Sequence, residues 1–133
     1  MINTLNESKI LTLFNPSEWE FKEFTKTPYF VDKTELILQL NDIIDQCDKL
    51  KNVCITRPRR FGKTVTENMI TAYYSYSESK ITVFDDKAIT KNENWDKYLG
   101  KFNVIQLNML NYFSLIKALD EGINKIKKDI IKM

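Results

Sequence analysis

Apolar residues in the first third of the chain are spaced as in amphipathic helices. Residues 7–14 predict a short helix that ends before Pro16. Residues 17–26 are predicted to cover the core with three aromatic side chains, Trp19, Phe21 and Phe24. A further helix, capped by Asp32 or Thr34, is predicted from the spacing of Leu36, Ile37, Leu40, Ile43 and Ile44.

Two short runs rich in β-branched and apolar residues resemble strands. Residues 52–56 predict a short buried strand, with Cys54 as a small buried side chain. Residues 102–109 have the composition of a second strand, and a helix predicted over residues 64–74 separates the two. We therefore predict an α/β three-layer fold, in which a small, partly parallel sheet is flanked by helices.

The C-terminal part predicts one more amphipathic helix. From Ser114 onward the apolar residues follow one another at helical spacing, as Leu115, Leu119, Ile123, Ile126 and Ile130. Lysines lie opposite this stripe, at positions 125, 127, 128 and 132. Such a stripe usually packs on a core, and the alternative is that it binds a partner or a membrane surface.

The strongest candidate for chemistry is a phosphate-binding loop between the first predicted strand and the helix that follows it. Gly62 allows the backbone to approach a phosphate, Lys63 can reach the terminal phosphates, and the Thr64 hydroxyl can ligate Mg²⁺. A helix that starts at Lys63 would point its free N–H groups at the same anion. The general pattern has glycine where this chain has Arg57, so the match is partial.

Three arginines precede the glycine of this loop. Arg57, Arg59 and Arg60 are predicted as additional phosphate contacts, because guanidinium groups bind phosphate in a bidentate manner. The same cluster also suits a nucleic-acid backbone or an acidic protein surface. We therefore predict ATP and Mg²⁺ as ligands of the loop and keep these two alternatives open.

Two motifs together resemble one known family. The loop sequence RPRRFGKT at residues 57–64, preceded by YFVDKT at residues 29–34, is similar to the AAA-ATPase-like family, and the similarity extends from Trp19 to the C-terminus. The resemblance implies a P-loop NTPase-like fold with ATP and Mg²⁺ as ligands. Family members continue with an acidic metal-binding strand, sensor positions and a lid, which this sequence does not contain. We therefore expect one truncated domain over residues 1–133, with a helical extension at 1–18 and a family-like region at 19–133.

Two other polar segments have alternative interpretations. Asp32, Lys33 and Thr34 belong to the second motif, so they either lie beside the nucleotide or cap the helix that follows. Asp85 and Asp86 follow a short apolar extended segment at residues 81–84, as metal-binding acids can. They come too soon after the loop, and we interpret them as part of a solvated turn.

Composition and charge narrow the possible chemistry. The chain has 133 residues and no histidine, which excludes imidazole bases and histidine-ligated metal sites. Its net charge of +2 gives no strong overall attraction to nucleic acid. No apolar run is long enough to span a membrane, and Cys47 and Cys54 are expected as reduced thiols. These features predict a soluble cytoplasmic protein.

These observations support more than one function. The first hypothesis is a nucleotide-binding P-loop module that does not hydrolyse ATP on its own. The second is a non-enzymatic interaction protein, such as a phage- or mobile-element-encoded inhibitor of a CRISPR or other nucleic-acid-handling complex. Its partner would be a larger protein or ribonucleoprotein bound through residues 57–60 or an exposed sheet edge, and a homodimer is an alternative. The third is an N-terminal fragment of a longer gene product.

Overall fold

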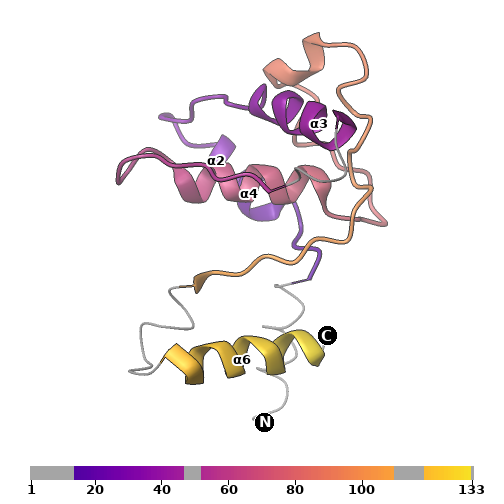
Figure 1. Ribbon diagram of the computed structural model, residues 1–133. Coiled ribbons are helices and arrows are strands. Elements are labelled where there is room, and N and C mark those ends of the chain that lie inside the picture. The colour runs from indigo at the N-terminus through magenta and orange to yellow at the C-terminus, as the bar shows by residue number, and fades with distance from the viewer. Residues whose placement is uncertain (1–13, 47–51, 110–118, 133) are drawn as a thin grey trace.

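The computed structural model describes residues 14–46, 52–109 and 119–132, and the regular elements among these residues are helices joined by long connecting segments (Figure 1). The helices are α2 (Trp19–Thr25), α3 (Leu36–Gln46), α4 (Lys63–Tyr74), the 3-10 helix η1 (Ala88–Lys91) and α6 (Leu119–Ile131). The helices predicted after Asp32 or Thr34, over residues 64–74 and near the C-terminus are thereby confirmed. The predicted helix at residues 7–14 lies almost entirely outside the described residues.

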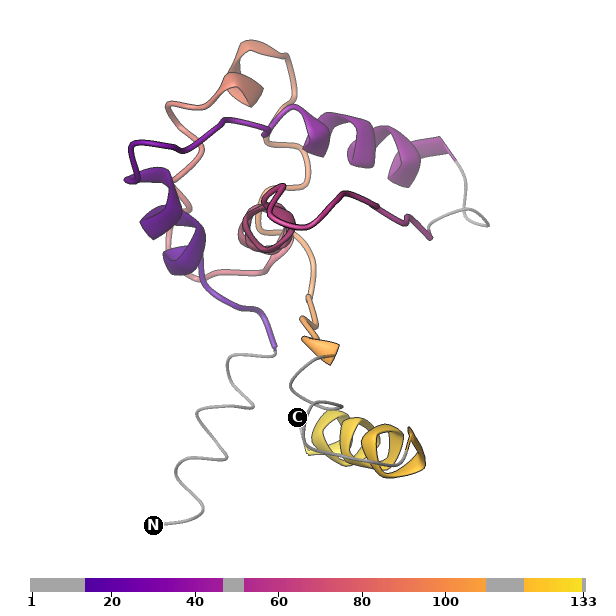
Figure 2. The same ribbon diagram turned by 90° about the vertical axis from the view of Figure 1, so that its left-hand side faces the viewer.

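Helix α4 is the centre of the packed part. Figure 2 views it nearly end-on, with α2, α3 and the connecting segments around it. The core consists of apolar side chains from α4 and from the segments that surround it, namely Phe21, Ile37, Met69, Ala72, Tyr73, Tyr74, Ile81, Val83, Phe84 and Ile89. Packing in this core stabilises α2, α3 and α4, which are too short to persist alone in water.

Only one of the three aromatic residues expected to cover the core is buried. Phe21 on α2 stacks on Phe84, with ring centroids 5.4 Å apart, and meets the edge of Phe30. Trp19 is 63% exposed and Phe24 is partly exposed. The predicted role of residues 17–26 is therefore confirmed for Phe21 and wrong for Trp19.

A buried polar network joins α3 to α4. The Asn41 side-chain amide donates to the Tyr73 hydroxyl at 3.2 Å, and the Tyr74 hydroxyl donates to the Asn41 carbonyl oxygen at 2.6 Å. The Tyr73 hydroxyl in turn donates to the Trp95 carbonyl. Burial raises the pKa of the Tyr73 hydroxyl and of the Tyr74 hydroxyl above the ordinary value of 10.0. The network fixes how α3 lies against α4.

The predicted α/β fold is wrong, because the described residues contain helices and no β-strand. Residues 52–56 are extended but unpaired and exposed, and Cys54 is exposed rather than buried. Residues 102–109 are also largely exposed, and they form isolated bridges at Phe102 and Ile105. The described residues therefore contain no sheet edge of the kind predicted as a binding surface for a partner or a dimer.

The backbone of residues 100–104 is bonded to groups other than a neighbouring strand. The N–H groups of Gly100 and Phe102 donate to carbonyls at the end of α4, at 2.7 and 3.0 Å. Val104 exchanges hydrogen bonds with Asn15, whose side-chain oxygen accepts its N–H at 2.7 Å. Backbone N–H and C=O groups need hydrogen-bond partners, but helix ends and side chains can supply them as well as a neighbouring strand can. An apolar extended segment therefore does not require a sheet.

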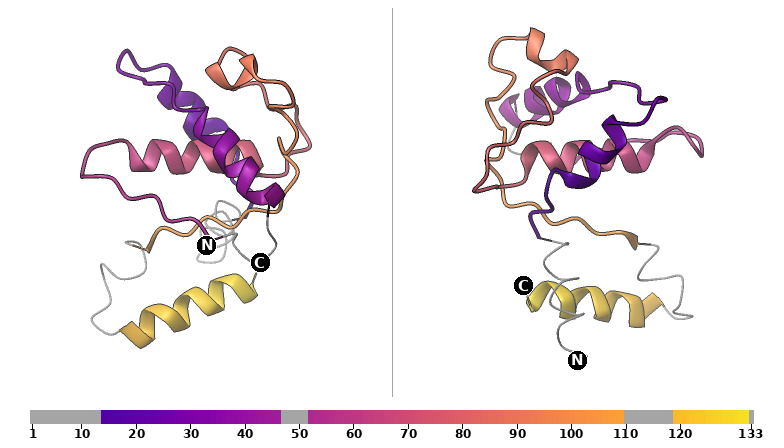
Figure 3. Two further views of the ribbon diagram at one scale, coloured as in Figure 1. Left: turned by 45° about the horizontal axis from the view of Figure 1, so that its top comes forward. Right: turned by 180° about the vertical axis from the view of Figure 1, so that it is seen from behind.

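Two other sequence interpretations concern residues outside the core. Asp85 and Asp86 lie exposed in a turn, as predicted, and Asp86 pairs with Lys87. Helix α6 lies apart from α2, α3 and α4 in both views of Figure 3. Its Ile123 and Ile130 are partly exposed and do not belong to the buried core of the described residues, and Leu115 of the predicted stripe lies outside these residues.

Candidate functional site

The predicted phosphate-binding loop leads directly into the N-terminus of α4. Lys63 is the first residue of the helix, as predicted, and Thr64 follows it in the first turn. Gly62 precedes the helix with a φ of 77°, a left-handed conformation that glycine adopts without the strain other residues incur. The glycine therefore turns the chain at the point where an anion would approach the helix.

The start of α4 has unpaired backbone donors. The Thr66 N–H donates to the Gly62 carbonyl at 2.9 Å and so closes the first helical turn. The N–H groups of Lys63, Thr64 and Val65 precede this bond and have no intrahelical carbonyl to reach. Gly62 provides no side chain to cap them. These donors and the helix dipole favour a negatively charged group at this position.

The side chains of the loop add positive charge. Arg57, Arg59, Arg60 and Lys63 are all exposed, and no ion pair within residues 14–46, 52–109 and 119–132 involves them. Arg60 has a φ of 65°, which is uncommon for a residue with a side chain. The nearest acid on α4, Glu67, instead accepts a hydrogen bond from Gln106 at 2.9 Å. The loop therefore presents its cations to solvent.

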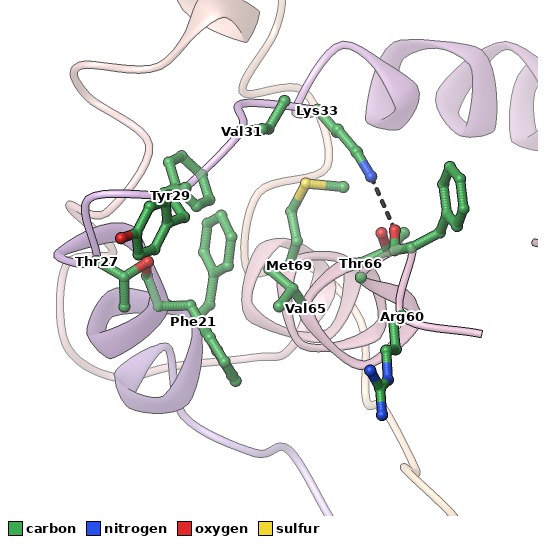
Figure 4. A pocket seen from close by; sticks show the side chains of 13 residues that line it. Phe21, Thr27, Tyr29, Val31, Lys33, Arg60, Val65, Thr66 and Met69 are labelled. Atoms are coloured by element: carbon green, nitrogen blue, oxygen red, sulfur yellow. Dashed lines mark hydrogen bonds between the residues drawn. The ribbon is translucent and has the colours of Figure 1, made fainter. Parts of the chain in front are cut away.

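Lys33 of the second motif contacts this loop. Its ammonium donates to the Phe61 carbonyl at 3.0 Å, and it would lie 3.7 Å from a Cβ placed on Gly62 (Figure 4). The bond connects two segments that are 28 residues apart in the sequence. Lys33 thus holds the loop and adds a further positive charge beside the N-terminus of α4.

Its two neighbours in the motif have a structural role instead. The Asp32 carboxylate accepts hydrogen bonds from the Thr34 N–H at 2.9 Å, the Thr34 hydroxyl at 2.7 Å and the Ala88 N–H at 2.7 Å. Burial alone would raise the pKa of Asp32, but these bonds and the charge of Lys87 together lower it below its ordinary value of 3.8. The Thr34 hydroxyl also accepts the Ile89 N–H at 3.1 Å. The pair therefore anchors η1 to the chain just before α3.

A pocket of about 300 Å³ lies beside the loop. Figure 4 shows it between α2 and α4, with Lys33 reaching over Met69 and Val65 toward the loop. Aromatic and apolar side chains form most of its wall, together with a few polar groups: Phe21, Phe24, Thr27, Tyr29, Phe30, Val31, Lys33, Arg60, Phe61, Gly62, Val65, Thr66 and Met69. The pocket and the loop therefore share Arg60, Phe61 and Gly62.

The metal prediction rests on one residue. Thr64 is an exposed residue in the first turn of α4. Within the described part of the chain, no group of three or more carboxylates or cysteines is placed to hold a metal. A Mg²⁺ ion at this position would therefore take most of its oxygen ligands from bound phosphate and water.

The sequence left two features of this site without detail. A position of Lys33 near the loop was one of two alternatives for its motif, but its bond to Phe61 joins residues far apart in the chain, which helical periodicity does not report. The aromatic side chains beside the loop, such as Tyr29 and Phe61, have no regular spacing either. The sequence indicated that the two motifs meet in space only because both occur together in one family.

Comparison with known proteins places the chain in a family. The model of the AAA-ATPase-like family, described as "Predicted AAA-ATPase", matches residues 19–132. Searches of curated proteins and of solved structures found no significant match. None of the described helices is long and apolar enough to cross a membrane. Because the family model covers most of the sequence, the chain belongs to the AAA-ATPase-like family.

Proposed function

We propose that this chain binds the phosphates of a nucleoside triphosphate, ATP with Mg²⁺, at the N-terminus of α4. The observation that carries the proposal is the convergence of two motifs on one point. Gly62 leaves the first amides of α4 unpaired, and Lys33 and Lys63 bring two cations to the same end of the helix. Membership of the AAA-ATPase-like family agrees with this ligand.

Each group has a distinct part in the proposed site. The backbone N–H groups at the start of α4 bind phosphate oxygens, and Lys63 neutralises the terminal phosphates. The Thr64 hydroxyl ligates Mg²⁺ together with those phosphates. Arg57, Arg59 and Arg60 add contacts from the exposed side of the loop. Lys33 keeps the loop in place through the Phe61 carbonyl.

Calorimetric titration with ATP, with and without Mg²⁺, tests the proposal on the whole chain. Lys63→Ala should abolish measurable binding, because Lys63 is the side chain that would contact the terminal phosphates. The matched control is Lys80→Ala, which removes an exposed lysine near the other end of α4. Equal affinity of the wild type and Lys63→Ala would show that the loop is not a phosphate site.

We propose binding without appreciable turnover by the chain alone. Transfer of a phosphoryl group needs metal ligation and a positioned nucleophile in addition to phosphate contacts. Asp85 and Asp86 lie in an exposed turn, and Glu67 is bonded to Gln106. Phosphate release at about 1 per second or faster, lost in Lys63→Ala, would contradict this proposal.

A second candidate function is binding of a larger acidic or nucleic-acid-containing partner without catalysis. It is favoured by the exposed arginines of the loop, which lie next to the exposed apolar side chains of Val53, Ile55 and Phe61. Interfaces combine arginine with apolar groups in this way. An inhibitor of a CRISPR complex or of a similar ribonucleoprotein would be one such protein.

A further inference from the structure

The pocket beside the loop has an aromatic rim that the fold does not use. Tyr29 is 89% exposed and Phe61 is 58% exposed, although both line the pocket. Phe21 and Met69, which also line it, are almost fully buried in the core. The pocket thus has a buried apolar floor and two largely exposed aromatic side chains at its rim.

The two rim residues come from the two motifs that meet at the loop. Tyr29 lies four residues before Lys33, whose ammonium bonds the carbonyl of Phe61 itself. The pocket is therefore continuous with the proposed phosphate site, since Gly62 and Arg60 belong to both. A ligand with phosphates at the N-terminus of α4 would extend its other end into this pocket.

The chemistry of the wall indicates what that other end is. Its volume of about 300 Å³ is at the lower limit of small-molecule sites, which suits a single ring system with its sugar. Exposed aromatic rings bind flat aromatic bases by stacking. The polar side chains of the wall are few, and the Thr27 hydroxyl already donates to the Phe24 carbonyl at 2.8 Å.

We propose that this pocket holds the base of the bound nucleotide, which stacks on Tyr29. The inference rests on the proposed phosphate site and adds a recognition element to it. Stacking tolerates different bases because each has a π face. The chain should therefore bind ATP and GTP with affinities that differ by only a few-fold.

The test compares ATP with inorganic tripolyphosphate, which carries the phosphates without a base. Tyr29→Ala should weaken ATP binding by roughly five-fold to one-hundred-fold, the range expected for one lost stacking contact. The affinity for tripolyphosphate should stay unchanged, and Tyr29→Phe should retain the ATP affinity. The matched control is Tyr76→Ala, which removes a tyrosine that is 54% exposed and lines a different surface pocket.

Each outcome separates the two proposals. If Tyr29→Ala leaves ATP affinity unchanged while Lys63→Ala abolishes it, the phosphate site stands and the base pocket is refuted. Equal losses for ATP and tripolyphosphate in Tyr29→Ala would refute the pocket, since Tyr29 would then act through the loop. If the wild type binds neither ligand, the phosphate site fails, and the pocket proposal fails with it.

A covalent label gives an independent readout. Irradiation with an azido derivative of ATP that carries the reactive group on the base should modify residues 27–33 or 61–69, as located by mass spectrometry of peptides. Excess tripolyphosphate should compete with this labelling. Labelling confined to other segments would refute the assignment of the pocket.

Discussion

Replacement of Thr34 by valine separates the structural part of the second motif from its ligand-binding part. Thr34 is completely buried, and its hydroxyl donates to Asp32 and accepts the N–H of Ile89. Valine keeps the shape of the side chain and removes both bonds. Lys33, the adjacent residue, points to the loop instead. Substitution of Thr34 should therefore lower stability and leave anion affinity unchanged, whereas substitution of Lys33 should lower anion affinity and leave stability nearly unchanged.

The expected loss of stability follows from the burial of the groups concerned. Ile89 is fully buried, so its N–H would be left without a partner in Thr34→Val. An unsatisfied buried donor costs about 1–3 kcal/mol, and we expect a loss of about 2 kcal/mol in the free energy of unfolding. For a chain of this length, such a loss lowers Tm by about 6–10 °C.

Thermal unfolding and anion titration together provide the assay. The control Thr27→Val removes an exposed hydroxyl that donates to the Phe24 carbonyl, and it should change stability by less than about 0.5 kcal/mol. Lys33→Met should leave Tm nearly unchanged and weaken tripolyphosphate binding about ten-fold, which corresponds to about 1.4 kcal/mol. Thr34→Val should keep wild-type affinity below its Tm.

Two results would refute this reasoning. A Thr34→Val variant with the Tm of the wild type would show that the bond to Ile89 does not hold η1 in place. A Thr34→Val variant that is stable but no longer binds tripolyphosphate would assign Thr34 to the ligand instead of the fold.

Three further predictions concern charge and pH. Because the pKa of Asp32 is lowered in the folded protein, its stabilising contribution is present above its unfolded value of 3.8 and is lost as pH falls through the folded value. The free energies of unfolding of the wild type and Asp32→Asn, measured in urea, should therefore become more similar as pH falls below about 4. The pKa of Tyr74 is raised by burial, so its contribution to stability is present below pH 10.0 and is lost as pH rises through the folded value. Above about pH 10, the free energy of unfolding should therefore fall less steeply with pH in Tyr74→Phe than in the wild type. The double variant Arg59→Glu, Arg60→Glu should weaken tripolyphosphate binding and any acidic partner complex with little change in Tm, because exposed charges contribute little to stability; unchanged affinity for both would remove these arginines from the site.

The sequence predicted the helices because their signal is local. In α4, Gly62 and the lysine that follows mark the start, although the second half of this helix is buried on all sides, at Thr71, Ala72, Tyr73 and Tyr74. In α3, apolar residues recur at helical spacing, and Ile37 lies in the core. Each of these features depends on residues close to one another in the sequence, so periodicity could reveal α3 and the loop signature could reveal the start of α4.

The sheet was wrongly predicted because a strand depends on a partner. Residues 52–56 have strand composition, yet no other described segment pairs with them. The Phe102 N–H is bonded to a helix end instead of a strand. Composition reports that a segment is apolar and β-branched, and it does not report which backbone groups will lie opposite.

The sequence predicted the loop residues of the candidate site, and it did not predict the pocket beside them. Gly62, Lys63 and Thr64 carry a local signature, whereas the approach of Lys33 depends on how α2 and α3 pack around α4. Tyr29 was noted only as part of a motif, and its place on the rim of a pocket required the three-dimensional arrangement.

The central claim is that an anion binds the amides at the N-terminus of α4. It is tested most directly by amide nuclear magnetic resonance of the labelled whole chain during titration with tripolyphosphate. We predict saturable shifts centred on the amides of residues 62–66, which disappear in Lys63→Ala. The claim is contradicted if those amides do not move, or if shifts of similar size are spread over exposed lysines such as Lys80 and Lys101.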